Sequence, residues 1–172
     1  MSGRNGVRRD WTLWADGRFV VTTPAVPHLP PEEGCHVLVA PHAPPPHAWA
    51  DPDLTAAAFG LAARVCGVME RLELAPWFNL QANGNWGLLP GKSPHFHIHV
   101  YGRRRGSTWG QPVQLPLAPG TFVYPPLPEA DHVRLAAALA ESLSDSWADR
   151  YACHVDDAQI PTALNDPPHR DA

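Results

Sequence analysis

The sequence has few charged residues and no long apolar run. Charged residues make up 17% of the 172 positions, and the formal net charge is −4. This weak negative charge gives no basis for general attraction to nucleic acid or to a membrane surface. No apolar stretch approaches the roughly 18 residues that a membrane-spanning helix needs. We therefore expect no nucleic acid and no membrane among the partners, and any anion site must come from a local cluster.

Paired cysteines are also lacking. Cys35, Cys66 and Cys153 are odd in number and far apart, so they form no Cys-x-x-Cys pair. This pattern favours a reducing compartment. Residues 1–4 are not followed by an apolar run, so we expect no signal peptide. The sequence thus predicts a soluble, cytoplasmic protein.

Hydrophobic residues, at 44%, are sufficient for the core of one domain, whereas 21 prolines predict long ordered loops. Asp51 and Pro52 are a helix-start pair, and the apolar spacing that follows predicts a helix ending before Pro76. A second helix is expected over residues 129–147. Strands are expected at residues 11–13, 19–22, 36–40, 78–81 and 95–101. Strands with helices packed on one side indicate an α+β fold with an antiparallel sheet.

Three histidines alternate with apolar residues in the last of these strands. His95, His97 and His99 share one face of an extended strand, with neighbours about 6–7 Å apart. Phe96, Ile98 and the next valine take the opposite face. The apolar face explains the strand but gives no reason for the imidazoles.

A metal site is one explanation of the histidine row. His-x-His on a strand suits zinc or iron, but the outer pair lies about 13 Å apart, too far for one ion. A metal would use two of the three histidines plus a ligand from elsewhere, and the next acidic residue after His99 is Glu129. A purely structural role is a second explanation, since a single histidine on a sheet is usually a satisfied polar group.

Chemistry on a phosphoryl group is the third explanation. A neutral central imidazole can attack phosphorus if an acceptor holds its other nitrogen and so fixes the tautomer. The outer imidazoles can orient phosphate oxygens and pass a proton to the leaving group. This reading requires no metal and no cofactor.

The stretch from His95 to Tyr101 resembles the His-φ-His-φ-His-φ-φ motif, with φ apolar, of the histidine triad family. The segment Gly34 to His42 is similar to the family strand that carries a further histidine, here His36. Asn83-Gly84 before a glycine-containing loop, and Gly102-Arg103 with Trp109 after the triad, add to the resemblance, which covers roughly residues 10–110.

The resemblance implies a five-stranded antiparallel sheet with two helices, commonly paired into a homodimer. Family members are nucleotidyl hydrolases and transferases that cleave at an α-phosphate through a covalent nucleotidyl-histidine. By motif position, His97 matches the nucleophile, and His95 and His99 match the flanking helpers. His36 matches the fourth family histidine. A nucleotide or nucleotide conjugate is therefore the expected substrate; a non-catalytic nucleotide-binding module is a further alternative.

Four residues are expected to bind substrate. Asn83 and Ser93 match positions that contact sugar or phosphate, and Lys92 places a cation where the family pattern has a neutral amide. Trp109 is a candidate to stack on a base, the alternative being loop packing.

Two departures from the family pattern concern the nucleoside and the chain length. Many members carry an aspartate for the ribose hydroxyls between the second strand and a proline, whereas the stretch from Phe19 to Pro24 has none and Asp16 fits the preceding turn. A catalytic domain is expected over residues 1–127, an added C-terminal helical extension over 128–155, and a tail over 156–172.

Overall fold

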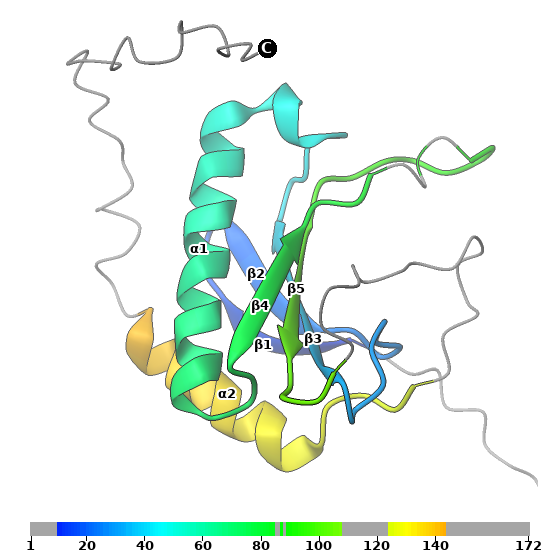
Figure 1. Ribbon diagram of the computed structural model, residues 1–172. Helices are drawn as coiled ribbons and strands as arrows, with labels where there is room; N and C mark the ends of the chain where they lie inside the picture. Colours follow the sequence, from blue (N-terminus) through cyan, green and yellow to red (C-terminus); the bar gives the residue numbers. More distant parts are fainter. Residues whose placement is uncertain (1–9, 85–86, 88, 108–123, 144–172) are drawn as a thin grey trace, which may run out of the picture.

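The computed structural model describes residues 10–84, 87, 89–107 and 124–143. Five strands form one antiparallel sheet in the order β1-β2-β3-β5-β4 (Figure 1). The strands are β1 (Trp11–Ala15), β2 (Phe19–Thr23), β3 (Gly34–Pro41), β4 (Trp77–Gln81) and β5 (Ile98–Arg103). The predicted α+β class and five-stranded antiparallel sheet are confirmed. Within the described residues, no helix is long and apolar enough to cross a membrane.

The first hairpin is closed by an aspartate side chain. The Asp16 Oδ1 atom accepts hydrogen bonds from the backbone N–H groups of Arg18 (2.7 Å) and Phe19 (2.6 Å). Such a local side-chain bond stabilises a tight turn. The predicted turn role of Asp16 agrees with these contacts.

Helix α1 (Pro52–Arg71) begins where the sequence predicts. The Asp51 Oδ1 atom accepts a hydrogen bond from the backbone N–H of Leu54 at 2.9 Å, and Pro52 occupies the first helical turn. One face of α1 is buried against β3 and β5. The buried side chains of this face are Ala57, Ala58, Leu61, Ala62, Val65, Val68 and Met69.

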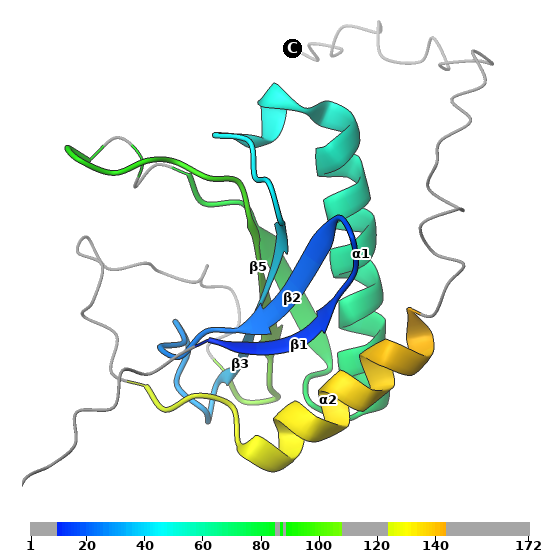
Figure 2. The same ribbon diagram turned by 180° about the vertical axis from the view of Figure 1, so that it is seen from behind.

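Helix α2 (Glu129–Ser142) packs against β1 and α1. Figures 1 and 2 show α1 and α2 on the same face of the sheet. Leu135 and Leu139 are fully buried in the same apolar cluster as the side chains of α1. The described residues thus hold two α-helices, and α2 is the C-terminal one. The division of the chain at residues 127 and 128 stays a prediction.

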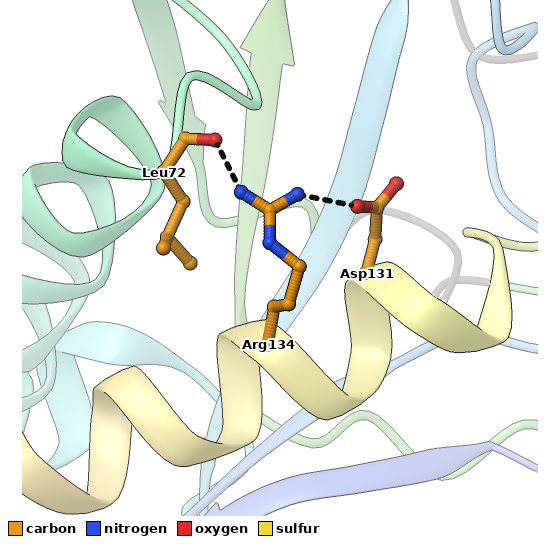
Figure 3. Close-up of polar contacts among 3 residues, drawn as sticks. All are labelled: Leu72, Asp131 and Arg134. Atoms are coloured by element: carbon orange, nitrogen blue, oxygen red, sulfur yellow. Dashed lines mark hydrogen bonds and ion pairs between the residues drawn. The ribbon is translucent and has the colours of Figure 1, made fainter.

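Arg134 joins the two helices at the surface (Figure 3). Its Nη2 donates a hydrogen bond to the backbone carbonyl of Leu72, at the C-terminal end of α1, over 3.2 Å. Its Nη1 lies 3.0 Å from the Asp131 Oδ1 atom, one turn earlier on α2. Because the last carbonyls of a helix lack partners within the helix, this contact satisfies one of them.

The strand predicted over residues 95–101 begins later than expected. β5 starts at Ile98, opposite Val39 of β3, and only His99 of the three histidines lies within it. Pro41, where β3 ends, has no N–H to donate to a longer ladder. The segment before β5 is held instead by the Phe96 N–H, which donates to the Pro45 carbonyl at 2.7 Å.

Candidate functional site

His36 and His99 meet on the face of the sheet opposite α1. Their neighbours along the strands, Val37, Val39 and Val100, belong to the core, so alternation turns the two imidazoles to the other face. His36 Nε2 lies 2.9 Å from His99 Nδ1, within hydrogen-bonding distance. His36 is 3% exposed and His99 is 6% exposed. The predicted proximity of His36 to the triad is present in the structure.

His28 joins this pair, although the sequence left it without an assigned role. The His28 ring lies 4.5 Å from the His36 ring and 5.1 Å from the His99 ring, measured between centroids. Its Nδ1 is 2.8 Å from the hydroxyl oxygen of Tyr101. His28 lies in the connection between β2 and β3, where no periodic pattern indicates its neighbours. Leu29, which clusters with Tyr101, shows that this connection folds back over the sheet.

Burial keeps these imidazoles neutral near pH 7. Loss of water contact, with a smaller effect of neighbouring imidazoles, lowers the pKa of His28 to about 4 and that of His99 to about 3. The pKa of His36 is lowered well below its usual value, mainly by burial and then by His99. A neutral imidazole has one N–H donor and one acceptor nitrogen, so each hydrogen bond fixes a tautomer.

His97 and His95 lie at the open end of the histidine row. His97 Nδ1 is 3.0 Å from the His95 backbone carbonyl, and burial lowers the pKa of His97. The His97 ring meets His99 edge-on at 4.6 Å and stacks on His95 at 5.1 Å, between centroids. Exposure decreases along the row, from exposed His95 through half-buried His97 to buried His99. The row therefore leads from solvent to the buried group of imidazoles.

A pocket of about 540 Å³ opens beside His95 and His97. It is lined by residues 46–49, residues 82–84 with Gly87, and residues 94–97. This volume lies within the range of small-molecule sites, about 300–1,000 Å³. The arrangement places a tautomer-fixed imidazole at the wall of a cavity large enough for a nucleotide-sized group.

Of the predicted substrate-binding residues that the structure describes, only Asn83 lines this pocket. Asn83 lines it, with its Nδ2 donating to the Gln81 Oε1 atom at 3.3 Å. Ser93 is exposed, and its backbone carbonyl lies 3.4 Å from His95 Nδ1. Lys92 is exposed and is not among the lining residues. Trp109 lies outside the described residues. The structure therefore brings Asn83 to the triad and leaves the other three assignments as predictions.

Arg103, at the opposite end of β5 from the pocket, is held in a structural contact. Its guanidinium lies 3.6 Å from the Glu33 carboxylate, and the residue is 6% exposed. The Arg104 N–H donates to the Glu33 carbonyl at 2.9 Å. These contacts hold Glu33, in the connection between β2 and β3, against the C-terminal end of β5.

Comparison with solved structures shows the histidine triad fold. A histidine triad protein from Sinorhizobium meliloti shares 21% identity, with a TM-score of 0.54 over 78% of this chain and 90% of the other. A histidine triad protein from Marinobacter aquaeolei has a TM-score of 0.54 and 17% identity over 78% and 89% of the two chains. A zinc-bound histidine triad family protein from Mycobacterium smegmatis has a TM-score of 0.52 and 21% identity, over 76% and 84%.

Sequence comparisons add no relative to these structural ones. No family model matches the sequence, and no curated protein matches it. The structural similarity thus defines the class: this chain has the fold of histidine triad proteins. At these identities the similarity concerns the fold, and the roles of the site residues follow from the geometry described above.

Proposed function

We propose that this protein is a histidine triad nucleotide hydrolase or nucleotidyltransferase that acts at an α-phosphate. His97 Nε2 attacks phosphorus, the bond from phosphorus to the leaving group breaks, and the leaving group takes up a proton from water at the open end of the histidine row. A nucleotidyl group remains bonded to His97 until water or another acceptor displaces it. A hypothetical histidine triad nucleotide-binding protein from Sulfolobus tokodaii, with a TM-score of 0.50 and 18% identity over 80% and 85% of the chains, supports a nucleotide substrate.

The contact between His97 Nδ1 and the His95 carbonyl carries this proposal. A carbonyl oxygen only accepts, so at 3.0 Å the His97 Nδ1 must carry the proton. The Nε2 atom of the neutral ring then holds the lone pair that attacks phosphorus. Because burial lowers the pKa of His97, this reactive form is present at pH 7.

The buried histidines position a hydrogen-bond donor beside His97, because a series of hydrogen bonds fixes the tautomer of each ring. The backbone N–H of His28 donates to His36 Nδ1 at 3.2 Å, which leaves the proton of neutral His36 on Nε2. His36 Nε2–H then donates to His99 Nδ1, so that the proton of neutral His99 is on Nε2. We assign to this His99 N–H the stabilisation of a phosphate oxygen or of the leaving group. His95, at the exposed end, is assigned to the other side of the phosphate.

The nucleoside is held without the aspartate that binds the ribose hydroxyls in many histidine triad proteins. Thr23, which precedes Pro24, is 2% exposed, and its Oγ1 bonds His132 Nε2 in the packing of α2. A buried hydroxyl with this partner is not available to the ribose hydroxyls. We therefore assign substrate contacts to Asn83, Ser93 and Lys92 and to the pocket beside His97, and Trp109 stays a candidate for base stacking.

Trapping the covalent intermediate tests the proposal. Nucleoside phosphoramidates, dinucleoside polyphosphates and sugar nucleotides are incubated with the full chain, and the protein is analysed by mass spectrometry above neutral pH. We expect a nucleotidyl adduct that maps to His97, and no turnover in His97→Asn. His42→Asn is the matched control, because His42 is exposed and lies outside the site. Full turnover in His97→Asn contradicts the proposal, whereas binding without turnover in the unaltered chain indicates a nucleotide-binding module.

A metal site is a second candidate, favoured by one observation. One nitrogen from each of His28, His36 and His99 lies within 4.8 Å of the others. Three neutral imidazoles are suitable zinc ligands with a fourth position open, and the structural neighbour from Mycobacterium smegmatis is zinc-bound. A cation here would replace the proton shared by His36 and His99. It would act as a Lewis acid or hold the three rings in place.

Metal analysis separates the two candidates. The metal site predicts about one tightly held metal per chain in the purified protein, retained on dialysis and reduced in His28→Phe. His28 is chosen because it lies outside the triad. A metal content that does not depend on His28, or activity that survives complete chelation, removes the metal candidate.

The expected compartment and assembly remain part of the proposal. Cys35 and Cys66 are free thiols, which supports a cytoplasmic, reducing setting. We propose a homodimer, as the fold class commonly forms. Light scattering at several protein concentrations tests the homodimer by mass.

A further inference from the structure

The pocket beside His97 has one aromatic wall that the triad does not explain. Trp49, in the 3-10 helix η1 (Ala48–Ala50), is 77% exposed and lines this pocket. Its ring stacks on the His47 imidazole, with 4.1 Å between centroids and 15° between planes. His47 also lines the pocket, and its Nδ1 is buried without a hydrogen-bond partner among the described residues. Trp49 and His47 together are called the aromatic wall below.

The backbone that carries the aromatic wall is hydrogen-bonded to neighbouring elements. The Thr55 hydroxyl of α1 donates to the Ala48 carbonyl at 2.6 Å, and the Ala50 N–H donates to the His47 carbonyl at 3.1 Å. Just before the wall, the Pro45 carbonyl accepts from the Phe96 N–H, which lies between His95 and His97. These bonds connect the backbone of the wall to that of the histidine row, so the two segments lie side by side at the pocket.

The lining chemistry limits what this pocket can bind. None of its described lining residues is Asp, Glu, Lys or Arg, so the part of a ligand that enters it is uncharged. His99, which meets the His97 ring edge-on, is buried and does not line the pocket, whereas His97 does. A substituent on a phosphorus atom bonded to His97 therefore has room on the pocket side. A flat ring there would stack on an indole that is otherwise exposed to water.

We propose that this pocket is a subsite for an uncharged aromatic ring of the substrate, carried by its leaving group or its base, which stacks on Trp49. The inference rests on the proposed function for the chemistry at His97. The ring-binding step itself requires no turnover and can be measured separately. The two sources of the ring share one chemistry and are separated by the choice of ligands.

Three ligands test the subsite by calorimetry in the full-length His97→Asn protein, where no reaction competes. They are the phenyl ester of adenosine 5′-phosphate, its methyl ester, and the methyl ester of ribose 5-phosphate. If the ring comes from the leaving group, the phenyl ester binds more tightly than the adenosine methyl ester. If it comes from the base, the adenosine methyl ester binds more tightly than the ribose one. Either preference is expected at roughly 3- to 10-fold, as for one aromatic stack.

Adding Trp49→Ala is expected to abolish the preference, and Trp49→Phe to restore part of it. The matched control is Trp77→Ala, because Trp77 is also exposed, at 59%, but lies on edge strand β4 outside the pocket. A ring preference unchanged by Trp49→Ala, or no binding of any of the three ligands, overturns the subsite. Adduct trapping on His97 is scored separately, so loss of the subsite leaves the reaction proposal standing, and the converse also holds.

Discussion

The imidazoles of His36 and His99 lie 2.9 Å apart between Nε2 and Nδ1, although 63 positions separate them in the chain. In the register of β3 and β5, His36 is opposite Tyr101 and Leu38 is opposite His99. The two histidines are therefore diagonal neighbours on one face of the sheet, within reach of each other's side chains. Through this bond, the backbone of the β2–β3 connection determines the tautomer of a triad histidine.

Replacing His36 tests whether its hydrogen bond fixes the tautomer of His99. In His36→Phe the ring volume is kept but the donor to His99 Nδ1 is lost, so the tautomer of His99 is no longer fixed. We expect kcat to fall by about 100-fold, the lower end for loss of one donor that stabilises developing charge, with little change in KM. Nitrogen NMR of the His99 ring should show a fixed Nε2–H tautomer in the unaltered protein and a mixture in the variant. A variant with normal kcat and an unchanged His99 spectrum would exclude this role of the hydrogen bond.

Acid is expected to destabilise the fold through its buried histidines. In the unfolded chain each has a pKa of about 6.5, whereas burial lowers the folded pKa of His28 to about 4 and of His99 to about 3, and that of His36 well below 6.5. Below pH 6.5 the unfolded state binds more protons, so the free energy of unfolding falls as the pH drops toward 4. Buried His36 and His99 each contribute up to about 1.4 kcal/mol per pH unit.

Urea unfolding at pH 7.5, 6 and 5 measures this slope. His36→Phe should flatten it, because one buried proton acceptor is removed, while His42→Phe, at an exposed position, should leave it unchanged. Equal stability at pH 7.5 and 5 in the unaltered protein would show that the buried imidazoles do not control the acid response.

Two glycines should respond to alanine in opposite directions. A Cβ atom at Gly34 would lie 1.8 Å from the Gly102 carbonyl oxygen, so the pairing of β3 with β5 would have to open. We expect Gly34→Ala to reduce the free energy of unfolding by about 2–3 kcal/mol, as overpacking does, and to lower activity because His36 and His99 lie on these strands. Gly67, inside α1, has no atom within 4 Å of the added Cβ, and Gly67→Ala should stabilise by up to about 1 kcal/mol. Chemical denaturation measures both, and a neutral Gly34→Ala would contradict the close packing of the strands.

The contribution of α2 to the core can be measured with two matched side chains. Leu139 is fully buried, whereas Val133 on the same helix is 58% exposed. We expect Leu139→Ala to cost about 2–5 kcal/mol of unfolding free energy, and Val133→Ala less than about 0.5 kcal/mol. A similar small effect of both would indicate that α2 is a detachable extension, as the predicted boundary at residue 127 implies.

Local sequence signals predicted most of the helices and strands, and the motif around His97 predicted the chemistry that we propose. Asp51-Pro52 fixed the start of α1, Asp16 closed the first hairpin, and the alternation around His99 placed imidazole and core on opposite faces. These features depend on side-chain spacing and on bonds to nearby backbone, which a sequence displays directly. The motif resemblance added the expected sheet, and solved structures with the histidine triad fold agree with it.

Only the tertiary structure brought His28 to His36 and His99, and Trp49 to the wall beside His97. Both residues lie in proline-rich connections, whose paths depend on long-range packing and on bonds such as that from Phe96 to Pro45. The tertiary structure also ended the ladder at Ile98, because strand length depends on partners from distant parts of the chain. The sequence thus predicts which imidazoles take part in the proposed reaction, through the motif that His95, His97 and His99 resemble. The tertiary structure determines which ring nitrogen of His36 and His99 carries the proton, and which residues line the pocket beside His97. Both depend on contacts between segments that lie far apart in the chain.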